Sequence, residues 1–137
     1  MRFSERFLLF LTRKPGSSDF ETSDNKQNLE NALSLLCRVF PNFLTNICCQ
    51  TVVDFGCGKG FQSVAMAITG AKYVLGFDTN VGAVKEARHM VQKYHLDGRV
   101  EFTDKLQNKF GGKFDVVISQ NSMEHFRDPV VALNEMK

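Results

Sequence analysis

The chain has 137 residues, of which 43% are hydrophobic and 23% are charged, values typical of a single globular domain. This composition excludes disordered, collagen-like and coiled-coil chains, and the formal net charge of +2 is too small to favour a nucleic acid or an anionic membrane as partner. No apolar run approaches the roughly 18 residues of a membrane span. Four cysteines without a Cys-x-x-Cys spacing or a secretory signal indicate free thiols, so we expect a cytoplasmic protein.

The N-terminal part of the chain is predicted to be a short apolar segment followed by a linker, over residues 1–24. Phe7–Leu11 is apolar, and residues 13–24 are polar and rich in turn-forming types. Three interpretations of Phe7–Leu11 remain open: a lid over a pocket, a docking strip or a dimer contact. A single domain is predicted over residues 25–137.

The first helix of this domain is expected just after the linker. Ser23 or Asp24 is a candidate cap, and apolar residues recur at helical spacing until Pro41, at Leu29, Ala32, Leu33, Leu36 and Phe40.

From residue 51 onward, strand and helix patterns alternate. Runs rich in β-formers predict strands over 51–55, 73–78, 100–103 and 114–119. Helical spacing predicts helices over 61–68 and 81–94, and Asp128-Pro129 has the cap and first-turn proline of a third. The alternation predicts an α/β class with a doubly wound, mostly parallel sheet.

The last predicted strand is expected at an edge of that sheet. The chain stops barely two turns into the helix that follows, although the Val-Val-Ile run of residues 116–118 is typical of a strand buried on both faces. We therefore expect either a truncated domain or a homodimer or partner chain that covers the edge; a naturally short chain is the remaining alternative.

A glycine-rich loop is the strongest functional signal. Asp54-Phe55-Gly56-Cys57-Gly58-Lys59-Gly60 follows a predicted strand, precedes a helix and has glycine at alternate positions. Glycine allows positive φ and close approach of a ligand, and the carboxyl end of a central strand is where α/β sheets bind nucleotides. Asp54 would repel a pyrophosphate and suits a ligand that carries an ammonium group, and it could also hold the loop by accepting backbone N–H bonds.

Further polar residues follow the other strands. Asp78 ends the second strand, 22 residues after Gly56, where a carboxylate can accept both ribose hydroxyls, although Asp78-Thr79-Asn80 also has the residue types of a helix cap. Asp104 could bond an adenine amine or simply belong to a loop. After the fourth strand, His125 is a candidate general base and Glu124 could orient it, or both could be structural. No residues have the spacing of a metal site.

Together these residues resemble the class I S-adenosylmethionine (SAM)-dependent methyltransferases, in particular the branch with many small-molecule enzymes. Asp54–Gly60 resembles the family's first motif, Asp78 its second acid and Asp104 approximately its third. Phe114–Ser119 with Glu124-His125 and Asp128-Pro129 resembles its fourth-strand motif. The resemblance covers roughly residues 25–137. A complete domain has more strands than the four predicted here, so the chain resembles one truncated after its fourth strand.

The resemblance implies a function and a set of site residues. Gly56, Gly58 and the Asp54 region would hold the methionine part of SAM, Asp78 the ribose, and Asp104 with Lys105 would lie near the adenine. The cofactor-binding residues implied are Asp54, Phe55, Gly56, Cys57, Gly58, Gly60, Asp78, Thr79, Asn80, Asp104, Lys105, Gln120 and Asn121. The methyl group would pass to an acceptor, expected to be a small molecule, leaving S-adenosylhomocysteine (SAH). If the acceptor must lose a proton, His125 would be the base.

Two other functions remain as alternatives. One is a non-catalytic module that binds the cofactor or a partner chain. The other is an NAD(P)-dependent oxidoreductase, whose fingerprint requires Gly or Ala where this chain has Phe61, and which assigns no role to Asp54.

Overall fold

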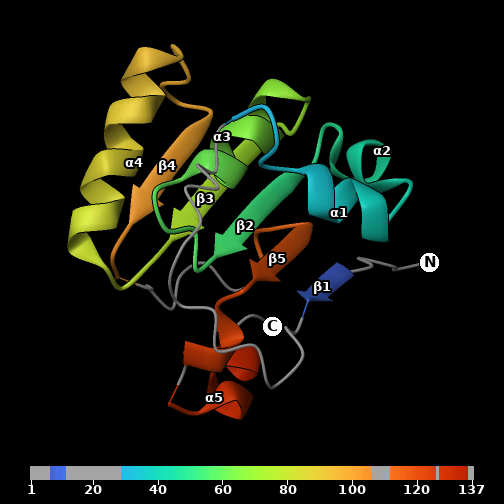
Figure 1. Cartoon of the computed structure of the whole chain (residues 1–137), viewed down its shortest axis with the longest axis vertical. Coiled ribbons are helices and arrows are strands. Elements are labelled where there is room, and N and C mark those ends of the chain that lie inside the picture. Colours follow the sequence, from blue (N-terminus) through green and yellow to red (C-terminus); the bar gives the residue numbers. More distant parts are fainter. Residues whose placement is uncertain (1–6, 12–28, 106–111, 126, 136–137) are drawn as a thin grey trace.

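Strands and helices alternate along the chain as the sequence patterns predict. The computed structural model describes residues 7–11, 29–105, 112–125 and 127–135 (Figure 1). The elements in chain order are β1 (Phe7–Leu11), α1 (Ser34–Val39), α2 (Phe43–Ile47), β2 (Thr51–Phe55), α3 (Phe61–Ile68), β3 (Tyr73–Phe77), α4 (Val81–Lys93), β4 (Val100–Thr103), β5 (Val116–Gln120), a 3₁₀ helix (Met123–His125) and α5 (Pro129–Glu135).

The strands form one parallel sheet in the order β1-β5-β2-β3-β4. The chain passes outward from β2 through β3 to β4, and then returns to the other side of β2 to form β5. In Figure 1 the arrowheads of all the strands point to the same end of the sheet. The predicted doubly wound, parallel α/β class is confirmed, and the order in which the strands are added reverses between β2 and β5.

The expectation that the strand near residues 114–119 lies at a sheet edge is wrong for the described residues. β1 pairs in parallel with β5 along its whole length, from Phe7 opposite Val116 to Leu11 opposite Gln120. Phe7–Leu11 is therefore a strand of the sheet. Its partner lies more than 100 residues away in the chain, and no local pattern encodes such a pairing.

Two predicted boundaries differ from the structure by more than one residue. Residues 29–33 form turns, and the helix begins only at Ser34, with Leu33 at its N-cap; the candidate caps Ser23 and Asp24 lie outside the described residues. β5 begins at Val116 rather than at residue 114, because the Asp115 carboxylate binds the Thr51 N–H at 2.8 Å and the Thr51 hydroxyl at 2.7 Å at the start of β2.

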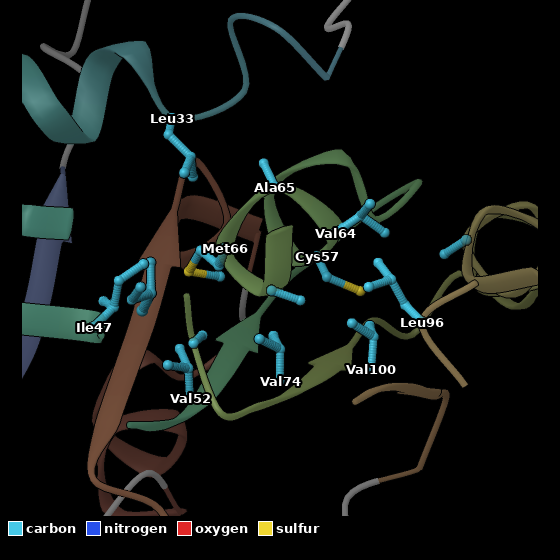
Figure 2. Close-up of a cluster of buried hydrophobic side chains, with 14 of the residues drawn as sticks. Leu33, Ile47, Val52, Cys57, Val64, Ala65, Met66, Val74, Leu96 and Val100 are labelled. Atoms are coloured by element: carbon cyan, nitrogen blue, oxygen red, sulfur yellow. The ribbon is translucent and has the colours of Figure 1, made fainter. Parts of the chain in front are cut away.

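The core lies mainly on one face of the sheet. There β2, β3 and β4 contribute Val52, Val74 and Val100, which Figure 2 shows together with Val64 and Met66 of α3. A smaller cluster of Val53, Phe55, Phe77 and Val117 covers the other face. Across the described residues, no helix is long and apolar enough to cross a membrane.

Candidate functional site

A cavity opens at the point where the strand order reverses. It has a volume of about 180 Å³ and lies at the carboxyl ends of β2 and β5. Ligands of open α/β sheets bind at such switch points because the loops of the two neighbouring strands diverge there. The cavity is lined by Ala32, Asp54, Gly56, Cys57, Gly58, Gln62, Gln120 and Asn121.

The glycine loop between β2 and α3 forms one wall of this cavity. Gly56, Gly58 and Gly60 all have positive φ, of 83°, 53° and 82°. The N–H groups of Gly56 and Cys57 both donate to the carbonyl oxygen of Phe77, at 2.8 and 2.9 Å, and so hold the loop against β3. No heavy atom of the described residues beyond its chain neighbours lies within 4 Å of the Cβ position of Gly58, which leaves that side of the loop open among these residues.

Asp54 lines the cavity although the residue is only 1% exposed. The Ser63 hydroxyl donates to its Oδ2 at 2.6 Å, and the Gln62 amide donates to its Oδ1 at 3.1 Å. Burial raises the pKa of Asp54 to about 6, and the nearby Asp78 carboxylate adds to this rise, whereas the bonds from Ser63 and Gln62 oppose it. A buried carboxylate without a Lys or Arg partner among the described residues is electrostatically suited to a cationic ligand.

Asp78 follows β3 and is bound by two backbone groups. Its Oδ2 accepts from the Gly58 N–H and its Oδ1 from the Asn80 N–H, both at 2.8 Å. Asn80 is the N-cap of α4, since its Oδ1 accepts from the Ala83 N–H at 3.1 Å. Asn80 thus provides the helix cap that Asp78-Thr79-Asn80 was expected to contain, whereas the bond from Gly58 makes Asp78 the acid that holds the glycine loop. Each carboxylate oxygen of Asp78 keeps a lone pair for a ligand hydroxyl. Thr79 is exposed beside it.

Gln120 and Asn121 form the opposite wall of the cavity. Gln120 ends β5, and its Oε1 atom is buried and has no hydrogen-bond partner within the described residues. Asn121 has a positive φ of 52°. The following residue, Ser122, donates to the Phe55 carbonyl oxygen at 2.9 Å, and this bond joins the loop after β5 to the end of β2.

Apart from Cys57, the remaining predicted site residues do not line the cavity, and neither do Gly60, Asp78, Thr79 and Asn80. Phe55 packs against Phe77 in the smaller cluster, with ring centroids 5.0 Å apart. Asp104 and Lys105 lie beyond β4, where Lys105 binds the Thr103 side chain. Glu124 and His125 are exposed on the 3₁₀ helix. Cys57 does line the cavity, and burial raises the pKa of its thiol well above the usual value, so this thiol stays neutral.

The sequence patterns did not point to three residues that line the cavity or bind the Asp54 carboxylate. Gln62 and Ser63 bind Asp54 from the first turn of α3, and Ala32 lines the cavity from the turns before α1. Gln62 and Ser63 could have been found from the sequence, because they are two consecutive polar residues just after the glycine loop, separated from it by Phe61. Ala32 has no such signal, because its contact depends on how the N-terminal turns pack on the sheet.

Comparison with known proteins decides the family. Residues 50–137 match the family model of the methyltransferase domain. The chain belongs to this family. The match confirms the resemblance to SAM-dependent methyltransferases that the glycine loop and Asp78 indicated, and it decides against the oxidoreductase alternative.

Similar proteins differ in their acceptors. The ribosomal protein L11 methyltransferase of Caldanaerobacter subterraneus subsp. tengcongensis is 41% identical over 68 residues, which are 50% of this chain and 22% of that protein. The tRNA U34 carboxymethyltransferase of Campylobacter hominis is 34% identical over 94 residues, 64% of this chain and 31% of that protein. The chain thus spans less than a third of the length of these relatives.

The fold matches solved methyltransferase structures. Magnesium protoporphyrin IX methyltransferase from Synechocystis PCC 6803 with bound SAH has a TM-score of 0.62 and 25% identity, over 79% of this chain and 49% of that one. A putative methyltransferase from Methanococcus maripaludis, at 17% identity and a TM-score of 0.61, supports the fold alone. These matches agree with the α/β class.

Proposed function

We propose that this chain binds SAM in the cavity between β2 and β5 and serves in methyl transfer from its sulfonium. The observation that carries this proposal is the pairing of a buried carboxylate with an unpartnered amide oxygen: Asp54 on one wall and Gln120 on the other. Both are acceptors, so they suit the ammonium group at the methionine end of SAM. A pyrophosphate would meet the same carboxylate and be repelled.

The other groups at the crevice fit the rest of the cofactor. The open side of the loop at Gly58 allows close approach of a ligand backbone. Asp78, held by Gly58 and Asn80, is the residue we assign to the ribose, with Thr79 beside it. Asp104 and Lys105 remain our candidates for the adenine end. We propose residues 25–137 as the cofactor-binding domain, with β1 of the N-terminal segment added to its sheet.

The chemistry requires little from the protein beyond alignment. The sulfonium of SAM supplies an already activated methyl group, so the protein contributes by orienting the acceptor and excluding water. Where the acceptor must lose a proton, we assign that role to His125, with Glu124 beside it on the 3₁₀ helix. Both side chains are exposed, which is compatible with contact to an acceptor that arrives from solvent.

We propose a small-molecule acceptor and a cytoplasmic location. The net charge of +2 supports the first, because binding a polyanionic RNA generally requires a basic surface. Four free cysteines support the second. Incubation with methyl-labelled SAM and the small-molecule, protein and RNA fractions of a cell extract tests the acceptor. Label confined to protein or RNA would reject our assignment.

The first experiment is calorimetric titration with SAH, with NAD as the control ligand. Binding of SAH alone supports the cofactor site. Absence of SAH binding by the folded chain at pH 8 would reject the proposal for this chain. SAH binding without label transfer to any fraction would favour the non-catalytic module.

A further inference from the structure

The carboxyl group of Asp54 is held on both of its oxygens by consecutive residues of α3. Ser63 donates to Oδ2 at 2.6 Å, and Gln62 donates to Oδ1 at 3.1 Å. Ser63 is completely buried, so water does not compete for this bond. The first turn of α3 thereby fixes the orientation of a side chain at the end of β2.

The protonation state of Asp54 decides what the cavity accepts. When ionised, Asp54 supplies a negative charge at the cavity, and the Oε1 of Gln120 supplies an acceptor that has no donor among the described residues. When protonated, Asp54 carries no charge to balance a cation and becomes a donor itself. Affinity for a ligand with an ammonium group must then fall.

The groups around Asp54 place the protonation equilibrium of its carboxyl group close to neutral pH. Burial disfavours the ionised form, and the Asp78 carboxylate beyond the glycine loop acts in the same direction. Cys57, on the loop itself, is a neutral buried thiol.

The other charged groups near the loop are directed elsewhere. Lys59 is paired with Glu86 at 3.1 Å on the surface, and the residues that face Asp54 from α3 and β5 are uncharged. Glu124 and His125 are exposed on the 3₁₀ helix. The bonds from Ser63 and Gln62 are thus the main contacts that favour ionisation.

We propose that Ser63 and Gln62 are positioning residues that keep Asp54 ionised near neutral pH, and so make cofactor affinity depend on the release of one proton from Asp54. The inference deepens the proposed function and rests on it. Ser63 and Gln62 need no contact with the cofactor themselves, because they act through the orientation and charge of Asp54.

The test is the affinity for SAH, measured by calorimetry from pH 5 to pH 8.5. In the unmodified protein, we expect constant affinity well above the Asp54 pKa of about 6 and a fall that approaches tenfold per pH unit below it. Ser63→Ala removes a bond that favours the ionised form, so the midpoint of the fall moves to higher pH. The variant loses affinity several-fold at pH 7 and recovers it toward pH 8.5.

Three further variants separate this role from a structural one. Ser119→Ala is the matched control, because it deletes another buried hydroxyl, whose hydrogen-bond partner among the described residues is Ser122, at 2.6 Å. The midpoint of this variant stays unchanged. His125→Gln changes an exposed residue of the 3₁₀ helix, and it also leaves the midpoint in place. Asp54→Asn abolishes the fall between pH 7 and pH 5.

Other outcomes would overturn either the inference or the proposed function. A loss of affinity in Ser63→Ala that is equal at pH 7 and pH 8.5 would show a merely structural role and overturn the inference. So would a flat profile in the unmodified protein that still binds SAH. No SAH binding at pH 8.5 would instead reject the proposed function.

Discussion

Asp78 Oδ2 accepts a hydrogen bond from the Gly58 N–H at 2.8 Å, across 20 residues of chain. The bond joins the end of β3 to the centre of the glycine loop. The same carboxylate accepts from Asn80 through its other oxygen. The acid that the sequence indicates for ribose binding therefore also holds the glycine loop, which lines the cavity.

Replacing Asp78 by Asn should weaken both roles. An amide has a single acceptor oxygen, so in either orientation its NH₂ group faces Gly58 N–H or Asn80 N–H. We expect SAH affinity to fall at least about tenfold, or about 1.4 kcal/mol, and the Gly58 amide to exchange hydrogen faster. Calorimetry and amide exchange by NMR measure these effects. Asp97→Asn, at an exposed position, is the charge-matched control, and an equal loss there would contradict the assignment.

Replacing Asp54 by Asn should stabilise the protein above pH 6. The folded-state pKa of about 6 lies above the ordinary value of 3.8, so the folded state binds more protons between these values. Stability contributed by this group therefore falls as pH rises from about 3.8 to about 6 and is constant above that. Asn avoids the loss, which amounts to at most about 3 kcal/mol.

Urea unfolding at pH 5 and pH 7.5 measures this effect. The advantage of Asp54→Asn over the unmodified protein should be larger at pH 7.5, even though the same variant loses cofactor affinity. A variant that is less stable than the unmodified protein at pH 7.5 would mean that the bonds from Ser63 and Gln62 outweigh the burial of charge.

Replacement by Ala should destabilise the protein to different degrees at two glycines of the same loop, Gly58 and Gly60. Both have positive φ, which costs an L-residue about 1–2 kcal/mol. A Cβ on Gly58 meets nothing within 4 Å, whereas one on Gly60 would lie 2.5 Å from the Phe102 ring and 2.8 Å from the Ala87 Cβ. We expect Gly60→Ala to destabilise the fold by about 1–3 kcal/mol more than Gly58→Ala, because the core is overpacked.

Urea denaturation of the two variants checks this difference. Adding Phe102→Leu to Gly60→Ala should recover part of the loss, since the smaller side chain removes the clash, and a double-mutant cycle isolates that coupling. Equal destabilisation by the two glycine substitutions would show that φ alone decides their cost.

Removing β1 should expose the edge of β5. Deletion of residues 1–11 leaves the backbone groups of Val116–Gln120 without the strand that pairs with them. An unpaired edge of a parallel sheet favours association with another chain. We expect dimers or larger species by light scattering after size exclusion. Deletion of residues 1–6 alone keeps β1 and is the control; a monomeric product from the longer deletion would contradict the expectation.

The sequence by itself predicted the central part of the fold closely. α3 and β4 have the predicted bounds, and β2, β3 and α4 agree to within a residue. These elements have strong local signals: β-rich runs that break into glycine, and apolar residues at helical spacing. The glycine loop, Asp54 and Asp78 could be chosen as site residues for the same reason, because the conformational demands of the loop are written in consecutive residues.

Only the tertiary structure decided which groups meet. The pairing of β1 with β5, the bonds of Ser63 and Gln62 to Asp54, and the unpartnered oxygen of Gln120 all depend on where separate elements pack. The same holds for the exposure of Glu124 and His125, which residue type alone does not predict. Local patterns encode backbone conformation because its energetics are local, whereas hydrogen-bond partners and burial arise from contacts between residues distant in the chain.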